Sequence, residues 1–322
     1  MKAMEVREGE LCWSDHAAPV AGAGEVLIRV HATAVNRADL MQRMGFYPPP
    51  AGASPILGLE CAGEVLSLGT GVSNFAVGDR VCALLSGGGY AEEVAVPAGQ
   101  VLPMPPGMDF EMAAAIPEVF ATAYLNLYRE AALQPGERVL LHAGASGVGT
   151  ASIQLCQAFG NPCFVTVGSA EKLERCRALG AQDGWNRHGG SFLPAVAAWA
   201  APDGVDVILD PVGGAYLEDN LMCLSLQGRL VLIGLMGGAD AQLSLAQLMM
   251  KRLRLMGSTL RAQSVEAKTA LMQEMERRLW PLFATGELHP VVEVALPIKE
   301  ASRAHALVEG NSTFGKVVLR VR

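Results

Sequence analysis

The sequence predicts a two-domain α/β protein in which a small β-barrel precedes a doubly wound parallel sheet. The first ~120 residues carry short runs that alternate apolar and polar residues between Gly/Pro turns, which is typical of small barrels. After this region, short apolar runs alternate with helical patterns that end at glycine, which is typical of a parallel sheet covered by helices. With 322 residues, 51% of them hydrophobic, the chain can bury two cores.

These patterns predict the elements in order. In the first part, strands are expected at residues 25–31, 64–69 and 91–97, with turns at residues 78–79 and 106–107. In the second part, strands are expected at residues 138–142, 163–167, 205–210, 229–234 and 253–257. Helices are expected before Gly160 and between Ser169 and Gly180. The last ~60 residues predict a long helix at about 264–284 and two strand-like runs, the second at 315–319, which complete the first domain.

Composition narrows the classes of function. The net charge of −7 and the absence of a basic run argue against nucleic-acid binding. No apolar stretch is long enough to cross a bilayer, and the N-terminus lacks the apolar core of a secretory signal, so we expect a cytoplasmic protein. The seven cysteines form no CxxC pair and are interpreted as reduced core thiols.

A glycine loop runs from Gly144 to Gly149, directly after a predicted buried strand and before a predicted helix. In this context glycine allows the backbone to approach a pyrophosphate, and the helix N-terminus stabilises the anion. The loop therefore predicts a dinucleotide site, although a ligand-free tight turn is the alternative. Ser146 is not part of a Gly-x-Ser-x-Gly nucleophile elbow, because position 148, where the second glycine of that pattern would stand, is valine.

The end of the next strand predicts which dinucleotide binds. An NAD enzyme places Asp or Glu there to bind the ribose 2′-hydroxyl, but this strand ends at Gly168-Ser169, with Lys172 following. A hydroxyl and a cation suit a 2′-phosphate, so NADPH is expected. Arg175 and Arg187 add charge here or are solvated surface. The segments 210–214 and 234–238 are expected to lie under the nicotinamide, or to be turns that need positive φ.

Several motifs together resemble a known family. The chain is similar to the zinc-independent quinone oxidoreductases of the medium-chain dehydrogenase/reductase superfamily, in the branch of zeta-crystallin and the tumour-suppressor-inducible NADPH:quinone oxidoreductase type. The motifs that carry the resemblance span the chain in order: residues 36–43, 58–60, 78–81, 114–118, 142–151, 168–172, 234–238 and 315–316.

The resemblance implies a GroES-like catalytic domain formed by residues 1–120 and 262–322, and a Rossmann NADPH-binding domain at 121–261. It implies a homodimer, with NADPH and a small-molecule quinone or enone in the interdomain cleft. The implied cofactor contacts are Ser146, Gly147, Val148 and Gly149 at the pyrophosphate, Gly168, Ser169 and Lys172 at the adenosine phosphate, and Thr122, Gly234, Leu235 and Met236 at the nicotinamide side. Asn36 and Tyr47 are the implied catalytic cleft residues, with Tyr47 also near the cofactor. Arg187 stands where many relatives have a tyrosine near the phosphate.

No metal is expected. Zinc-bearing relatives use Cys or His at three positions, where this chain has residues 36–39 without cysteine, Leu59 and Glu118. The stretch from 84 to 96, where relatives insert a four-cysteine lobe, contains no cysteine.

These features favour hydride transfer to an electron-poor acceptor. Without a Lewis acid, a quinone needs only to be positioned over the nicotinamide, so quinone reduction by NADPH is the primary hypothesis. An enal or enone reductase is the alternative, which must also protonate carbon. A non-catalytic NADPH-binding protein is the third reading. Tyr47 is either a substrate contact and proton donor or a tyrosine packed on the proline loop that follows it. The apolar strand Leu253–Met256 at the sheet edge offers a route to dimerisation.

Overall fold

The structure, a computed structural model, describes all 322 residues and divides into two compact units. Unit 1 comprises Met1–Ala121 and Leu260–Arg322, and unit 2 comprises Thr122–Thr259. No helix is both long enough and apolar enough to span a membrane. The functional roles expected for the two sequence-defined domains stay a prediction.

Unit 2 is built on a six-stranded sheet in which every neighbouring pair is parallel. Its order is β10-β9-β8-β11-β12-β13, the order of dinucleotide-binding sheets, which reverses direction between β8 and β11. The strands are β8 (Val139–Leu141), β9 (Cys163–Val167), β10 (Asp183–Asn186), β11 (Val205–Asp210), β12 (Leu224–Leu232) and β13 (Arg254–Gly257). The five strands expected here are confirmed. The structure adds β10, which the sequence did not predict because this strand has no apolar run. All four of its residues are only partly buried.

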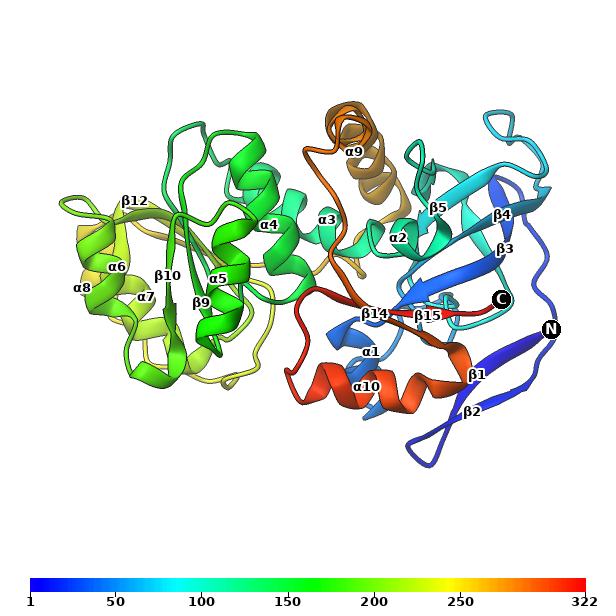
Figure 1. Ribbon diagram of the computed structural model, residues 1–322, viewed down its shortest axis with the longest axis horizontal. Coiled ribbons are helices and arrows are strands. Elements are labelled where there is room, and N and C mark those ends of the chain that lie inside the picture. The colour runs from blue at the N-terminus through cyan, green and yellow to red at the C-terminus, as the bar shows by residue number, and fades with distance from the viewer. The chain divides into compact units, whose positions relative to one another are not determined.

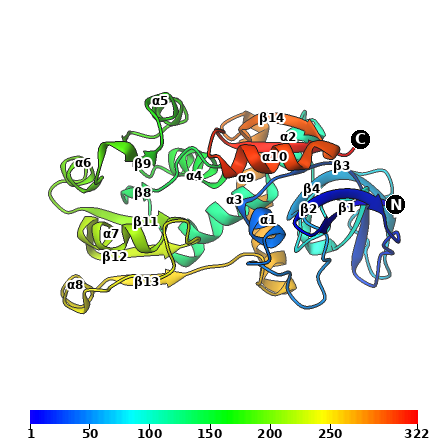
Figure 2. The ribbon, with the colours of Figure 1, turned by 90° about the horizontal axis from the view of Figure 1, so that it is seen from below.

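Helices cover both faces of this sheet. Figure 2 shows α6, α7 and α8 along one side of the strands and α4 on the other. The helices of unit 2 are α4 (Gly147–Ala158), α5 (Ala170–Ala178), α6 (Leu193–Trp199), α7 (Leu217–Cys223) and α8 (Leu245–Met250), preceded by the end of α3 (Pro117–Tyr124) and a π-helical segment (Leu125–Glu130). Strand residues such as Leu140 and Ile208 pack against Val196 and Leu221 of the helices, which buries the core on this side.

Unit 1 is organised around one long strand. β3 (Glu25–Ala34) pairs with β4 along one edge, while β6 and β15 pair with the start and the end of its other edge. The sheet order is β14-β15-β3-β4-β5-β7, and Figure 1 shows β15, in red, beside β3, in blue. The other strands are β4 (Glu60–Leu68), β5 (Arg80–Leu84), β6 (Glu93–Pro97), β7 (Val101–Pro103), β14 (Val292–Pro297) and β15 (Lys316–Arg320), with a separate hairpin of β1 (Lys2–Arg7) and β2 (Glu10–Asp15).

Four helices complete unit 1 besides the start of α3: α1 (Arg37–Arg43), α2 (Phe110–Ala114), α9 (Val265–Thr285) and α10 (Ala301–Glu309). The long helix expected at 264–284 is confirmed as α9. Ser264 caps its first turn, and Gly286 ends it with a φ of 80° that glycine adopts without strain. All seven cysteines of the protein are free and six are buried, as expected for core thiols.

Candidate functional site

The predicted glycine loop forms the turn between β8 and the first residue of α4. Ser146 caps the helix, because its Oγ accepts the amide of Gly149 at 3.0 Å. The amides of Gly147 and Val148 have no hydrogen-bond partner within the chain. Free amides at a helix N-terminus bind anions, since they add hydrogen bonds to the favourable dipole. The loop therefore offers the donors that a pyrophosphate needs.

Packing explains two of the glycines. A Cβ added at Gly149 would lie 2.4 Å from the carbonyl oxygen of Ala143, and a Cβ added at Gly144 would lie 2.7 Å from the Cβ of Val165. Neither clash can be relieved by turning a flexible side chain, so both positions require glycine. Because glycine has no side chain, a ligand can also approach the loop backbone closely.

The end of β9 is followed by a serine hydroxyl and lies beside the guanidinium of Arg187. Ser169 caps α5 and accepts the amide of Lys172 at 3.2 Å, which leaves the hydroxyl proton able to donate. Arg187 directly follows β10, the strand that pairs with β9. Its side chain lies against Gly168, because a Cβ added at Gly168 would be 3.6 Å from the Arg187 Nε. Glu171 is exposed on the helix. This group of residues fits the 2′-phosphate of NADPH better than the free hydroxyl of NADH.

The glycine-rich segments after β11 and β12 are joined backbone to backbone. The amide of Gly237 donates to the carbonyl of Val212 at 2.7 Å, and the amide of Gly214 donates to the carbonyl of Gly238 at 2.9 Å. The first segment follows β11, which flanks the reversal point of the sheet where ligands bind in open α/β sheets, and the second follows the neighbouring strand β12. Leu235 and Met236 are 56% and 51% exposed on this surface.

A second group of predicted residues gathers in unit 1 around a buried ion pair. The Nζ of Lys316 lies 2.7 Å from Glu60 Oε1, and the two side chains are 4% and 0% exposed. Asn36 bridges them, because its Nδ2 donates to Glu60 Oε1 at 2.9 Å and its Oδ1 accepts Lys316 Nζ at 2.7 Å. The predicted catalytic residue Asn36 is thus held by both charges of the pair.

Glu118 adds a carboxyl to this group. Its amide donates to Glu60 Oε2 at 2.9 Å, so both oxygens of Glu60 are engaged. Burial, with a smaller contribution from the negative charge of Glu60, raises the pKa of Glu118 to about 8, and Lys316 opposes the shift. The carboxyl therefore retains its proton at neutral pH. Thr122, expected near the nicotinamide, follows Glu118 by one turn on the same face of α3.

Asp39 holds the backbone of Asn36 in place by a hydrogen bond. Its two carboxylate oxygens accept the amide of Asn36 at 2.8 Å and the amide of Gly58 at 3.0 Å. Burial raises the pKa of Asp39 to about 6, and these two hydrogen bonds oppose the shift. Gly58 has a φ of 100°, which explains its place in the motif.

Tyr47, the other predicted catalytic residue, is positioned by Arg261. Arg261 donates to the carbonyl of Tyr47 at 3.2 Å, to Gln42 Oε1 at 2.7 Å and to the carbonyl of Ser86 at 2.9 Å. Its guanidinium lies 5.4 Å from the Tyr47 ring centroid. Burial and the nearby Glu118 raise the pKa of the Tyr47 phenol, so it stays protonated. Unit 1 thus places two protonated oxygen acids, Tyr47 and Glu118, near each other.

Sequence reasoning missed Glu60 and Lys316 as members of this group, and considered Glu118 only as a zinc position. The charged residues could be seen in the sequence, but their grouping depends on which strands pair. Asn36 follows β3, while Glu60 and Lys316 begin β4 and β15, the two strands that pair with the end of β3. Isolated charges that begin apolar strands do not identify their partners until the strand order is known.

At the zinc positions of relatives, Asn36 and Asp39 are hydrogen-bonded within the polar group, Leu59 is 1% exposed, and Glu118 is next to Glu60. No three His, Cys, Asp or Glu side chains are grouped so that they could hold a metal ion. That the protein works without zinc stays a prediction, which metal analysis of purified protein tests.

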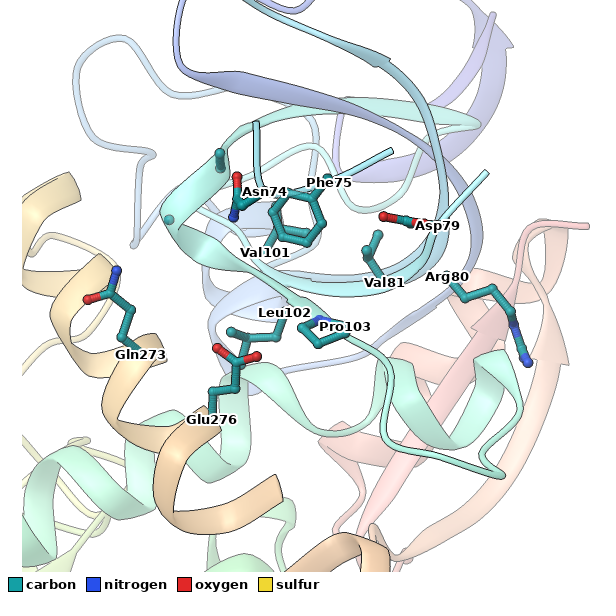
Figure 3. A pocket seen from close by; sticks show the side chains of 12 residues that line it. Asn74, Phe75, Asp79, Arg80, Val81, Val101, Leu102, Pro103, Gln273 and Glu276 are labelled. Carbon is teal, nitrogen blue, oxygen red and sulfur yellow. The ribbon is translucent and has the colours of Figure 1, made fainter. Parts of the chain in front are cut away.

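A cavity in unit 1 lies apart from these residues. It measures about 480 Å³ and lies between β7, the segment before β5, and α9, from which Gln273 and Glu276 point toward it (Figure 3). None of the predicted site residues lines this cavity. It is a shallow feature of the barrel surface and takes no part in the two groups of residues described here.

Comparisons with known proteins agree with this geometry. The alcohol dehydrogenase GroES-like domain matches residues 22–106, and the zinc-binding dehydrogenase domain matches residues 147–277. The human synaptic vesicle membrane protein VAT-1 homolog is 32% identical over 94% of this chain and 80% of its own length. The rat quinone oxidoreductase is 30% identical over 95% of this chain and 92% of its own length.

Solved structures are similar over the whole chain. The quinone oxidoreductase of Escherichia coli complexed with NADPH has a TM-score of 0.88 at 28% identity and covers 99% of this chain and 98% of its own. The apo JamJ enoyl reductase has a TM-score of 0.87 at 28% identity, with the same coverage. The chain therefore belongs to the medium-chain dehydrogenase/reductase superfamily, with quinone oxidoreductases among its homologues. It is an oxidoreductase of this superfamily, so the family resemblance and the two-domain fold class expected from the sequence are confirmed.

Replacing Glu118 by Gln should reduce the dependence of the free energy of unfolding on pH. The ordinary pKa of this carboxyl is 4.5, whereas the pKa in the folded protein is about 8. Between these values the folded protein holds one more proton than the unfolded chain, so wild-type stability falls as pH rises. Glutamine does not titrate. Relative to wild type, Glu118→Gln should therefore be more stable at pH 8 than at pH 5 by about 3 kcal/mol in urea unfolding.

The exposed Glu10→Gln on β2 is the matched control and should change stability equally at the two pH values. A Glu118→Gln variant whose difference from wild type is the same at pH 5 and pH 8 would show that this carboxyl is ionised in the folded protein.

Proposed function

We propose that this protein reduces quinones with NADPH and without a metal ion. The observation that carries the proposal is the end of β9, where Ser169 caps α5, Lys172 stands in the first turn of that helix, and the Arg187 guanidinium lies next to Gly168. In the known sheet order, this place receives the adenosine ribose of a bound dinucleotide. NADPH supplies a hydride when bound, and the NADPH complex of the E. coli relative supports the choice of cofactor.

The proposed contacts follow the geometry of unit 2. The free amides of Gly147 and Val148, with Ser146 and Gly149, would hold the pyrophosphate at the start of α4. Gly168, Ser169, Lys172 and Arg187 would hold the 2′-phosphate, where a hydroxyl and two cations replace the carboxylate of NAD enzymes. Thr122 and the segment Gly234, Leu235 and Met236 would contact the nicotinamide side.

Residues of unit 1 support acceptors that need little activation. At the positions where zinc-bearing relatives have Cys or His, this chain has an amide, a leucine and a protonated carboxyl. Such a group polarises a carbonyl weakly, so the acceptor itself must be electron-poor. A quinone meets this condition, and Asn36 and Tyr47 would orient it by hydrogen bonds.

Reduction of an enal or enone is a second candidate, because one observation favours it. Tyr47 and Glu118 both retain their protons at neutral pH and lie near each other. Protonation of the substrate carbon requires such a donor, whereas a hydroquinone takes its protons from water. The structural likeness to the JamJ enoyl reductase supports the same candidate.

Lys172→Glu should raise the KM for NADPH at least about tenfold and change the KM for NADH about twofold or less. A carboxylate at this position repels the 2′-phosphate but has no charge to repel on the 2′-hydroxyl of NADH. Arg177→Glu is the control, since Arg177 lies on the same helix, ion-paired with Glu174 and Asp183. Initial rates with both cofactors measure the effect, and equal changes for NADPH and NADH would refute the 2′-phosphate assignment.

Purified protein should reduce 1,4-benzoquinone and 9,10-phenanthrenequinone with NADPH at least about tenfold faster than 2-hexenal, measured as kcat/KM. Tyr47→Phe should lower the rate with 2-hexenal by about 10²-fold, the size of a lost proton donor, and change quinone rates little. Faster turnover of 2-hexenal would favour the enone reductase instead. Tight NADPH binding without turnover of any acceptor would identify a binding protein and contradict both enzymatic candidates.

The edge of the unit 2 sheet supports the expected homodimer. β13 is the last strand in the order, so one of its edges has no strand partner. The helix just before it exposes an apolar group, which we call the α8 patch: Leu245, Met249 and Met250 are 70%, 71% and 74% exposed. Exposed edges and apolar patches together mark association surfaces, and two copies joined edge to edge would cover both.

Met250→Glu should shift the protein from dimer toward monomer in sedimentation velocity at micromolar concentration, since a charge in an apolar interface is costly to bury. Val20→Glu is the control, because Val20 is an equally exposed apolar residue of unit 1 at 84%. The dimer proposal fails if wild type sediments as a monomer, or if Met250→Glu and Val20→Glu remain equally dimeric.

A further inference from the structure

A chain of buried polar side chains runs across the carboxyl edge of the unit 2 sheet. His142 follows β8, Thr166 lies in β9, Asp210 ends β11, and Asn220 lies in α7. These four side chains belong to residues that are at most 4% exposed. The Nδ1 of His142 lies 2.9 Å from Thr166 Oγ1, and its Nε2 lies 2.7 Å from Asn220 Oδ1. Asn220 Nδ2 then donates to Asp210 Oδ2 at 2.9 Å.

The partners fix the position of each proton. The Asp210 carboxylate accepts, so Asn220 must turn its NH₂ group toward it and its oxygen toward His142. An amide oxygen only accepts, so the proton of the imidazole is on Nε2. The Nδ1 is then an acceptor and receives the hydroxyl proton of Thr166. Burial lowers the pKa of His142, which agrees with a neutral ring that donates on one side and accepts on the other.

Both ends of this series of hydrogen bonds, Asp210 and Thr166, also bind backbone amides of segments that are proposed to face the dinucleotide. Asp210 Oδ1 accepts the amides of Val212 at 2.6 Å and Gly213 at 3.2 Å, which shapes the segment that follows β11. At the other end, the carbonyl of Thr166 accepts the amide of Gly144 at 3.0 Å. The polar chain therefore connects the glycine loop, the end of β9 and the segment after β11, which are the three places where unit 2 presents groups to a dinucleotide.

Aromatic rings keep the imidazole in place. The rings of Tyr216 and Phe192 each have their centroids 4.8 Å from that of His142. These contacts restrict rotation of the ring, so the hydrogen bonds alone decide which neighbour each nitrogen faces.

We propose that His142 is a positioning residue, which as a neutral Nε2–H imidazole fixes the segment after β11 relative to the phosphate-binding loops. This inference rests on the proposed NADPH-dependent function, because it assigns the segment after β11 to the nicotinamide side. Without the hydroxyl of Thr166, the buried Nδ1 has no donor, and an unsatisfied buried acceptor is costly. The ring then gives up its bond to Asn220, and Asp210 loses its fixed orientation.

The test compares Thr166→Val, which removes the hydroxyl at nearly constant volume, with Thr166→Ser, which keeps it. Thr166→Val should lower kcat with NADPH and a quinone about tenfold, because misplacement of a reacting group slows transfer. The Kd for 2′,5′-ADP, which reports on the adenosine end alone, should stay within about twofold. Thr166→Ser should restore the wild-type kcat. Ser152→Ala is the control for loss of a buried hydroxyl in unit 2, since Ser152 Oγ has no hydrogen-bond partner.

The outcomes separate the two proposals. If wild type binds no NADPH, the proposed function is wrong and this inference falls with it. If wild type binds and reduces quinone but Thr166→Val matches Thr166→Ser in kcat, the positioning role alone is wrong. A fall in kcat that Ser152→Ala reproduces, or that comes with an equal loss of 2′,5′-ADP binding, would show a general structural defect and also refute the role.

The tautomer of His142 gives a second test. It is measured on the wild-type protein and needs no bound ligand. In wild-type protein labelled with ¹⁵N at histidine, the signal that disappears in His142→Gln belongs to His142, one of six histidines. Its Nε2 should carry a proton and its Nδ1 should not at neutral pH. A proton on Nδ1, or on both nitrogens, would contradict the hydrogen-bond chain and overturn the inference.

Discussion

The carboxyl ends of the parallel strands in unit 2 all meet at one edge of the sheet, and this convergence governs what the unit can do. The sheet cannot pair the polar groups beyond the last residue of each strand, so they must find other partners. Some are satisfied within the protein, such as the Gly149 amide on Ser146. Others, such as the amides of Gly147 and Val148, have no hydrogen-bond partner within the protein. Because the strand order reverses between β8 and β11, the segments after these strands diverge and leave room between them.

In unit 1, a buried polar group is satisfied by an opposite charge as well as by hydrogen bonds. Glu60 is fully buried, which is unfavourable for a carboxylate unless hydrogen bonds and an opposite charge compensate. Lys316, Asn36 and the amide of Glu118 supply that compensation. Burial, and to a smaller extent the negative charge of Glu60, make a second charge unfavourable here, so Glu118 retains its proton. A structural ion pair and a protonated carboxyl thus have one physical cause, the exclusion of water from the ends of β4 and β15.

The sequence predicted much of this because local rules decide it. The strands of unit 2 are apolar runs, and the glycine loop and the Ser169 cap depend only on neighbouring residues. Elements with weak local signals were missed, such as the polar strand β10 and the short helices α1 and α10. The candidate site divides in the same way. Ser146, Gly168 and Lys172 could be named from one motif each, whereas Glu60 and Lys316 meet only because β3 pairs with both of their strands.

The pairing of β15 with β3 also bears on how the chain acquires its structure during synthesis. Unit 2 is one continuous stretch, so it can fold as soon as it leaves the ribosome. Unit 1 cannot, because β3 must wait for β15, which is translated after the whole of unit 2. Until then Glu60 lacks Lys316, and the apolar edge of β3 lies open to other chains. The interval between the synthesis of β3 and that of β15 is therefore when the nascent protein is most exposed to aggregation and most dependent on chaperones.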